Sequence, residues 1–246
     1  MNHSYSSLTL YEKCPWLFYQ KNILHTPEKN EENINMAIGL AVHKSIESQL
    51  NGVQKIVADA QALKESFQNP PNSSLIYMQG LSVIPESFIL DSSGFQVKTE
   101  KRMFFHLPTP RVSEPFTTKF DAYWVNGNRL NIVDWKTGAH VDKDAEKQLQ
   151  FYALGGIIST RTGKNPIEEV SCTLYYLKLH EAKTLEYIWG CEDVENIMEW
   201  AISTAESVES CIGSQSKSDP EQTYERNRES TECNWCPYRT ECFVSL

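Results

Sequence analysis

The stretch FTTKFDAYWVNGNRLNIVDWKTG, residues 116–138, decides the fold class of this chain. Two runs with β-like patterns flank an Asn-Gly pair, and such a pair is typical of a two-residue β-hairpin loop. With Asn126 and Gly127 as the loop, counting outward places Asp121 opposite Ile132. We therefore predict two antiparallel strands, Phe116 to Val125 and Leu130 to Trp135, joined at this loop.

The charged residues of this hairpin are predicted to share one face. Side chains alternate between faces along a strand, so Asp121, Asp134 and Lys136 fall on the same side. In this register Asp134 is the diagonal neighbour of Asp121, close enough for both carboxylates to bind one ion. A lone Asp-x-Lys is ordinarily a salt bridge at a sheet edge. The alternative is a hydrolytic site, where carboxylates bind Mg²⁺ or Mn²⁺ and the lysine orients water and offsets phosphate charge.

Working outward from the hairpin, periodicity predicts alternating helices and strands. Helices are expected over Ser6 to Asn22 with a break at Pro15, Ile34 to Leu50, Val53 to Phe67, Asp144 to Thr160, and Val194 to Ile212. Further strands are expected over Val83 to Leu90, Phe95 to Leu107, Val170 to Leu179, and Leu185 to Trp189. The strands before Lys136 would form an antiparallel meander. This order of elements indicates an α/β domain.

Three motifs in this order resemble those of the PD-(D/E)XK nuclease superfamily. Asp121 followed by Val133-Asp134-Trp135-Lys136-Thr137-Gly138 resembles its paired acids and (D/E)-x-K-T-G signature. The segment Gly39-Leu40-Ala41-Val42-His43 is similar to the G-x-x-x-H helix of the RecB-like branch. The segment Gln148-Leu149-Gln150-Phe151-Tyr152 is similar to the Q-x-x-x-Y motif of that branch, and its end residues share a helix face.

The resemblance implies a role for each of these residues. His43, Asp121 and Asp134 would bind Mg²⁺ or Mn²⁺ together with the backbone carbonyl of Trp135, and Lys136 would be the catalytic lysine. Gln148 and Tyr152 would position the DNA strand or the lysine. Glu100, on the preceding strand, is a further candidate acid. Taken alone, each residue has an ordinary structural explanation, such as a helix histidine, a surface pair or a salt bridge. Their order and spacing together favour a metal-dependent nuclease site.

The cysteines form a second constellation. Cys233, Cys236 and Cys242 have the spacing C-x₂-C-x₅-C, whereas a tetrahedral metal or a cubane cluster usually needs four ligands. Ligand identity alone leaves zinc and iron–sulfur open. The segment from Ser6 through Cys14-Pro15 to Tyr19 resembles the opening of the Cas4 and RecB/AddB-like iron–sulfur exonucleases, which implies a [4Fe–4S] cluster on Cys14 and the C-terminal trio. The remaining cysteines Cys172, Cys191 and Cys211 are interpreted as structural thiols.

The resemblance implies a restriction-endonuclease-like core, with a central mixed β-sheet flanked by helices and the termini joined by the cluster. We expect one nuclease domain over residues 1–246, with cluster-binding ends at 6–24 and 233–242 and a catalytic core over about 34–190. It would be a DNA exonuclease acting on single-stranded ends, in recombination and repair or in CRISPR spacer processing. The alternative is a catalytically silent nucleic-acid-binding scaffold subunit with a structural metal cluster.

Composition bears on partners and location. The formal net charge of −9 mildly disfavours a nucleic-acid binder, because affinity for phosphate comes largely from Lys and Arg, although net charge says little about a local groove. No stretch approaches the roughly 20 apolar residues that cross a bilayer, and Met1 to Leu10 has no export-signal pattern. We therefore expect a cytoplasmic protein, of a prokaryotic cell or encoded by a phage. Its expected partners are DNA, single-stranded or with free ends, and proteins of recombination or CRISPR adaptation, and no membrane is expected.

Overall fold

The computed structural model describes residues 1–28, 34–67, 72–141, 144–161, 163, 165–214, 223–227, 231–234, 236–239 and 242. The chain divides into two compact units, each assembled from separate stretches. The first unit comprises Met1–Glu31, Phe104–Thr117 and Glu195–Leu246, and the second comprises Glu32–Met103 and Thr118–Val194. Among the described residues no helix is long and apolar enough to cross a membrane.

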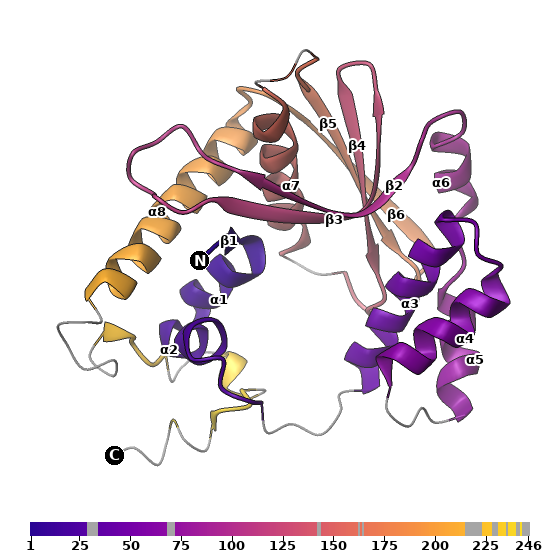
Figure 1. Cartoon of the computed structure of the whole chain (residues 1–246), viewed down its shortest axis with the longest axis horizontal. Coiled ribbons are helices and arrows are strands. Elements are labelled where there is room, and N and C mark those ends of the chain that lie inside the picture. Colours follow the sequence, from indigo (N-terminus) through magenta and orange to yellow (C-terminus); the bar gives the residue numbers. More distant parts are fainter. Residues whose placement is uncertain are drawn as a thin grey trace. The chain divides into compact units, whose positions relative to one another are not determined.

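The second unit is built on a mixed β-sheet (Figure 1). Its strands are β2 (Lys98–Phe105), β3 (Phe116–Asn126), β4 (Arg129–Lys136), β5 (Glu169–Tyr176) and β6 (Glu181–Ile188), the first residues of β3 and the last of β2 belonging to the first unit. β2 pairs with β3, the pairs β3/β4 and β5/β6 are antiparallel, and the central pair β4/β5 is parallel. The predicted α/β class with a mixed central sheet is thereby confirmed.

Helices cover both faces of this sheet. They are α3 (Ile34–Leu50), α4 (Lys55–Ser66), α5 (Asn72–Leu81), α6 (Glu86–Asp91) and α7 (Ala145–Thr160). Helices α3 to α6 bury an apolar cluster against alternate residues of the strands, including Val133 and Trp135. On the other face, a Cβ at Gly156 of α7 would lie only 2.5 Å from Leu130 Cδ2, so glycine lets this helix approach β4 closely.

The hairpin forms where predicted, but its register differs. Asn126 pairs with Arg129 and Tyr123 with Ile132, so the loop is Gly127-Asn128 and not Asn126-Gly127. Gly127 has φ +62°, whereas Asn126 stays extended, which is the pattern of a type II′ turn with glycine at its first central position. Each residue of β3 therefore faces a residue of β4 that lies two positions later than predicted. Because two is the side-chain period of a strand, the charged residues keep their common face.

The predicted strand over Val83 to Leu90 is wrong, since α6 occupies Glu86–Asp91. Pro85 precedes the helix with φ −61°, a geometry that suits a helix start, and Glu86 adds a favourable charge to the first turn. Phe88 alone of the apolar run is fully buried, with edge-to-face contacts to Trp124 and Trp135. A short apolar run does not distinguish a strand from a helix, and here one aromatic anchor decided for the helix.

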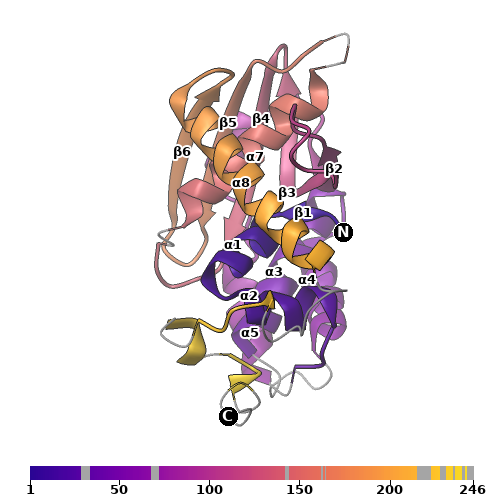
Figure 2. The same cartoon turned by 90° about the vertical axis from the view of Figure 1, so that its left-hand side faces the viewer.

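The first unit consists mainly of short N-terminal elements and one long helix (Figure 2). These are β1 (His3–Ser4), α1 (Tyr5–Lys13), α2 (Pro15–Phe18), the π-helical turn Tyr19–Ile23, α8 (Glu192–Ser214) and the 3₁₀ turn Thr231–Asn234, α8 beginning in the second unit. Strand β1 pairs with Phe116 and Thr117 at the start of β3. Helix α8 buries a stripe at helical spacing that includes Ile197, Ala201, Ala205 and Val208.

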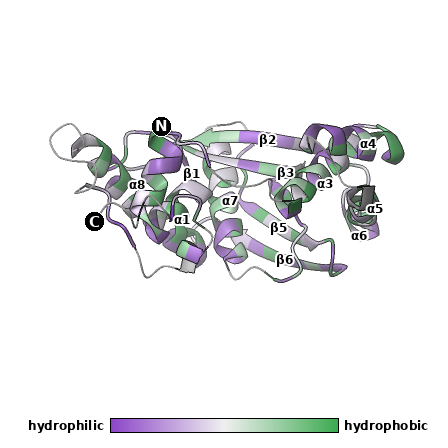
Figure 3. Ribbon diagram, turned by 90° about the horizontal axis from the view of Figure 1, so that it is seen from below, coloured by the Kyte–Doolittle hydropathy of each residue, from purple (hydrophilic) through white to green (hydrophobic). Residues whose placement is uncertain are grey.

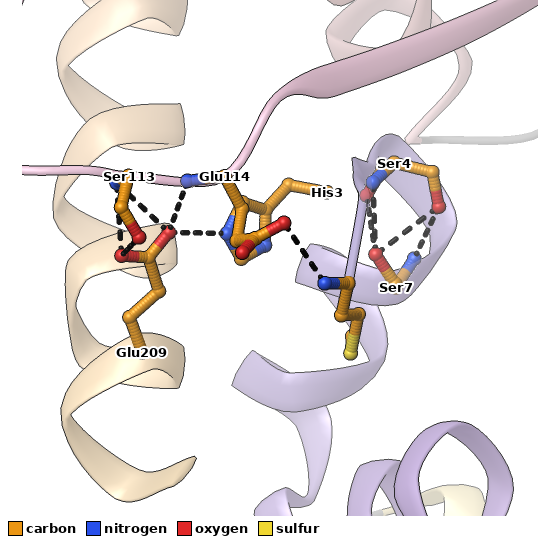
Figure 4. Close-up of polar contacts among 7 residues, drawn as sticks. His3, Ser4, Ser7, Ser113, Glu114 and Glu209 are labelled. Carbon is orange, nitrogen blue, oxygen red and sulfur yellow. Dashed lines mark hydrogen bonds and ion pairs between the residues drawn. The ribbon is translucent and has the colours of Figure 1, made fainter. Parts of the chain in front are cut away.

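A carboxylate of α8 fastens the start of the chain (Figure 4). Glu209 accepts hydrogen bonds from the backbone N–H groups of Ser113 and Glu114, from the Ser113 hydroxyl, and pairs with buried His3 at 3.0 Å. Burial acts to raise the pKa of Glu209, but these hydrogen bonds outweigh it and lower the pKa to about 2. These contacts therefore stabilise the first unit more when Glu209 is ionised.

We expect Glu209→Gln to lower the free energy of unfolding by up to about 3 kcal/mol at pH 7, because a pKa lowered from 4.5 to about 2 corresponds to that stabilisation. Since the folded pKa is depressed, the stabilisation is complete above pH 4.5 and disappears as the pH falls through about 2. Urea unfolding at pH 7 and pH 3 measures it. Glu206→Gln, which removes an exposed ion pair to Arg111, is the control and should cost under about 1 kcal/mol. Equal losses in the two variants would contradict the prediction.

Candidate metal-dependent active site

The predicted catalytic residues all lie in the second unit, and helix α3 brings His43 to the sheet. His43 Nδ1 lies 3.2 Å from Asp121 Oδ2 on β3, and His43 also forms a hydrogen bond with the backbone of Trp135. Gly39, one turn earlier on α3, permits this approach, because a Cβ there would lie 3.2 Å from Thr137 Oγ1. The G-x-x-x-H pattern thus has a steric meaning: the glycine lets the helix reach the end of β4.

The two aspartates meet at neighbouring positions of β3 and β4. Extending the register by one pair places Asp121 beside Asp134, directly opposite and not diagonal. Asp121 Oδ2 accepts a hydrogen bond of 2.8 Å from the Trp135 N–H. The Trp135 side chain points to the other face, where it packs on Phe88 and Tyr175. This buried ring anchors the backbone at the position where a metal-binding carbonyl was predicted.

Lys136 is held by a chain of polar contacts. Its Nζ lies 2.9 Å from Asp134 Oδ2 and donates a 2.7 Å hydrogen bond to Gln148 Oε1. Gln148 Nε2 in turn donates a 2.7 Å hydrogen bond to the Tyr152 hydroxyl, and the Tyr152 ring meets Phe120 edge-to-face. Because Gln148 and Tyr152 lie one turn apart on α7, they form a support for the lysine. The sequence left open whether this pair would position DNA or the lysine, and its observed contact is with the lysine.

The pKa values of Asp134, His43 and Tyr152 are all shifted from their ordinary values. Burial raises the pKa of Asp134, and the charge of Asp121 raises it further, although Lys136 and His43 act in the opposite direction. Burial lowers the pKa of His43, but the hydrogen bond and charge of Asp121 outweigh it, so the net shift is upward. Burial, followed by the charges of Asp134 and Asp121, holds the pKa of Tyr152 well above its ordinary value. Two carboxylates side by side, one of them buried, disfavour each other's ionised form, and a bound cation would relieve this repulsion.

One group of side chains in the described part of the chain offers three or more metal ligands within 4.8 Å of one another: His43, Glu100 and Asp121. Asp134 Oδ2 is fully buried and receives no well-directed hydrogen bond from any described residue, so it too has capacity for a ligand. Hard carboxylate oxygens suit Mg²⁺ or Mn²⁺, and the imidazole inclines the set toward Mn²⁺. The residues present therefore fit a divalent ion.

Sequence reasoning missed one residue beside this group. Lys119 forms an ion pair with Glu100, from the neighbouring strand. The pattern of alternate residues does not reveal such a pair, because it depends on how β2 pairs with β3. In the sequence, the one signal for this pair is that Lys119 is a basic residue two positions before Asp121.

The four cysteines predicted as cluster ligands lie in the first unit, and no disulfide joins any two cysteines in the described part of the chain. The sulfurs do not come within 4.8 Å of one another as a group in the described residues. Buried Cys14 caps α2 and shares an apolar cluster with Leu17, Tyr238 and Cys236. Burial raises the pKa of Cys236, and the nearby thiols of Cys14, Cys242 and Cys233 add to it. The soft thiol donors thus come from both ends of the chain.

The mixed sheet brings together the paired aspartates and the lysine that the sequence motifs singled out. A family model of the PD-(D/E)XK nuclease superfamily matches residues 2–243, so the chain belongs to this superfamily. Members act on nucleic acids with divalent metal ions, which agrees with the donor set described above. The superfamily expectation from the motifs is therefore confirmed.

Solved structures resemble the fold at low sequence identity. A presumed exonuclease from Eubacterium rectale is similar with a TM-score of 0.59 and 12% identity, over 95% of this chain and 87% of that chain. The protein SSO0001 aligns over 94% of this chain and 96% of its own, with 16% identity and a TM-score of 0.38. The first likeness supports the fold. No curated protein sequence matches this chain significantly.

Proposed function

We propose that the protein is a metal-dependent exonuclease that hydrolyses phosphodiester bonds at single-stranded DNA ends. The observation that carries this proposal is the meeting of His43, Asp121, Asp134 and Lys136, which come from α3, β3 and β4, at one place. The motif resemblance to RecB-like enzymes and the similarity to a presumed exonuclease support exonuclease action in particular.

The residues of the site would divide the work between them. A divalent ion held by His43, Asp121, Asp134 and the Trp135 carbonyl would polarise the scissile phosphate and make the attacking water a better nucleophile. The Lys136 ammonium, fixed by Asp134 and Gln148, would orient that water and offset the growing phosphate charge. An ammonium group that is already held in place needs little reorganisation as the reaction proceeds. This arrangement favours an active enzyme over a silent scaffold.

A local basic surface makes the net charge of −9 compatible with binding to DNA. The edge strand β2, hydrophilic over much of its length in Figure 3, carries Lys98, Lys101 and Arg102 as exposed residues beside Glu100. Lys101 and Arg102 have no ion-pair partner among the residues that the structure describes. Cations without partners next to a candidate metal site suit a phosphate backbone, whatever the charge of the rest of the chain.

A cleavage assay tests the proposal directly. End-labelled and internally labelled single- and double-stranded DNA would be incubated with the protein, with and without Mn²⁺. We expect Mn²⁺-dependent release of short products from single-stranded ends and none from the Asp121→Asn variant. Cleavage of circular single strands at the same rate would show an endonuclease. No cleavage of any substrate would support the scaffold alternative.

We also propose that Cys14, Cys233, Cys236 and Cys242 hold a [4Fe–4S] cluster. The shared apolar cluster of Cys14 and Cys236, and the influence of the other three thiols on the pKa of Cys236, support this grouping. Thiolates that each bind a different iron of a cubane stand further apart than the ligands of a single ion. The cluster would link the start of the chain to its end, and its first contribution would be to stability.

Protein purified without oxygen is expected to be brown and to contain about four irons per chain, because a cubane holds four irons on four thiolates. Cys14→Ser should lose most of this iron, whereas Cys172→Ser, a buried thiol of the second unit, should keep it. Iron and zinc analysis with the visible absorption spectrum measures the outcome. One zinc per chain without iron would replace the cluster by the zinc site that the cysteine spacing also allows.

A further inference from the structure

Glu100 reaches the candidate metal site from a third direction. Its carboxylate, a nitrogen of His43 and a carboxylate oxygen of Asp121 lie within 4.8 Å of one another, although the residues belong to β2, α3 and β3. The Glu100 side chain is 20% exposed, so it faces the inside of this group more than solvent. Neither the pairing of the strands nor the acid-x-lysine signature requires an acid here.

The backbone of Glu100 explains how the side chain reaches the site. Glu100 has φ +50°, a left-handed conformation that is rare for a residue with a side chain and rarer within a strand. Regular alternation would place Lys101 and Arg102 on opposite faces, yet both are exposed. A local irregularity of this kind re-aims a side chain, and at an edge strand it is often found next to a functional site.

A lysine currently neutralises this carboxylate. Lys119 of β3 forms an ion pair with Glu100 and is 51% exposed, so its ammonium can move into solvent at little cost. A divalent cation near Asp121 would compete with that ammonium for the same carboxylate oxygens. The ion carries twice the charge of the ammonium group. His43 and Asp121 lie close to Glu100 and would serve as co-ligands.

We propose that Glu100 is a further ligand of the divalent ion and that the ion displaces Lys119 from it when it binds. The proposal rests on the function proposed above, since it concerns the ion of that same site. In the displaced position Lys119 remains two residues from Asp121 and becomes available to a substrate phosphate. The ordinary alternative is a cross-strand ion pair that only stabilises the sheet edge, which predicts no effect of either residue on metal affinity.

Calorimetric Mn²⁺ titration of the full chain separates these alternatives without measuring catalysis. Glu100→Gln should weaken Mn²⁺ binding by about 10-fold or more, because glutamine has the shape of glutamate but lacks the negative charge of the ligand. Lys119→Met should tighten binding by about twofold to fivefold, the size expected for removing a half-exposed competing ion pair. The double variant should bind as Glu100→Gln does, since Lys119 acts through Glu100.

Matched variants complete the experiment. Glu186→Gln and Arg129→Met remove another exposed ion pair between strands of the same unit and should leave Mn²⁺ affinity unchanged. Glu100→Asp, which keeps the charge but shortens the reach, should also bind more weakly than wild type. Circular dichroism of every variant checks that the fold is retained. Asp121→Asn serves as the reference for loss of the whole site.

The outcomes are distinguishable. If Asp121→Asn loses Mn²⁺ while Glu100→Gln and Glu100→Asp bind as wild type does, Glu100 is not a ligand and the proposed nuclease function stands. If Lys119→Met tightens binding equally with and without Glu100, the lysine acts only by its general charge and the displacement is refuted. If Asp121→Asn also binds Mn²⁺ normally, the metal site itself, and with it the proposed function, is wrong.

Discussion

Lys136→Ala is expected to lower the rate of DNA cleavage by about 10²–10³-fold while Mn²⁺ still binds, because a preorganised positive group acts mainly in the transition state. Its ammonium touches Asp134 and Gln148, so the variant leaves the carboxylates and the imidazole in place. Asp134→Asn should also abolish cleavage. In that variant Mn²⁺ affinity should fall by about 10-fold or more, since a ligand charge is lost from the ion's surroundings.

Single-turnover cleavage at saturating Mn²⁺ and calorimetric titration of each variant measure the two effects separately. Lys183→Ala removes an exposed lysine that pairs with Glu146 in the same unit, and it should cleave at the wild-type rate. If Lys136 and Asp134 formed only a salt bridge at the sheet, both substitutions would cost at most about 1 kcal/mol of stability and leave cleavage intact. That result would refute the assigned roles.

Asp59→Ala is expected to lower the free energy of unfolding by about 3–5 kcal/mol, because it leaves a partly buried ammonium and two hydroxyls without their acceptor. Asp59 is 1% exposed and accepts hydrogen bonds from Ser45 Oγ at 2.5 Å, Ser82 Oγ at 2.6 Å and Lys55 Nζ at 2.7 Å. Lys55 also donates to the Gln79 carbonyl at 3.0 Å. This network ties α3, the helix that carries His43, to α4 and to the end of α5.

Urea unfolding followed by circular dichroism measures the effect. Glu65→Ala is the matched control, since Glu65 lies on the same helix and pairs with Lys44 at the exposed surface, and its loss should cost under about 1 kcal/mol. Asp59→Ala should also weaken Mn²⁺ binding, because α3 positions His43. A variant as stable as wild type would mean that water replaces the carboxylate without loss.

The faces of the hairpin could be predicted from sequence because alternation is a local property of a strand. Asp121, Asp134 and Lys136 share one face in the predicted register and in the observed one, since the two differ by the period of the side chains. The spacing of Gly39 and His43, and of Gln148 and Tyr152, likewise follows from the helix repeat. Local periodicity thus determined which residues face the site.

Position along the strands and contacts between elements required the tertiary structure. The residue that takes positive φ in the loop decided that Asp121 lies opposite Asp134. Packing of Phe88 on two tryptophans decided that Val83 to Leu90 does not form a strand.

The pairing of Glu100 with Lys119 and the anchoring of Asp59 join residues of different elements, and no pattern within one element encodes them. The sequence by itself therefore determined the superfamily and the α/β class, and it placed the candidate site residues on common faces, because these follow from residue types at short spacings. Only the tertiary structure decided which carboxylate neighbours which cation, because that depends on how separate elements pack.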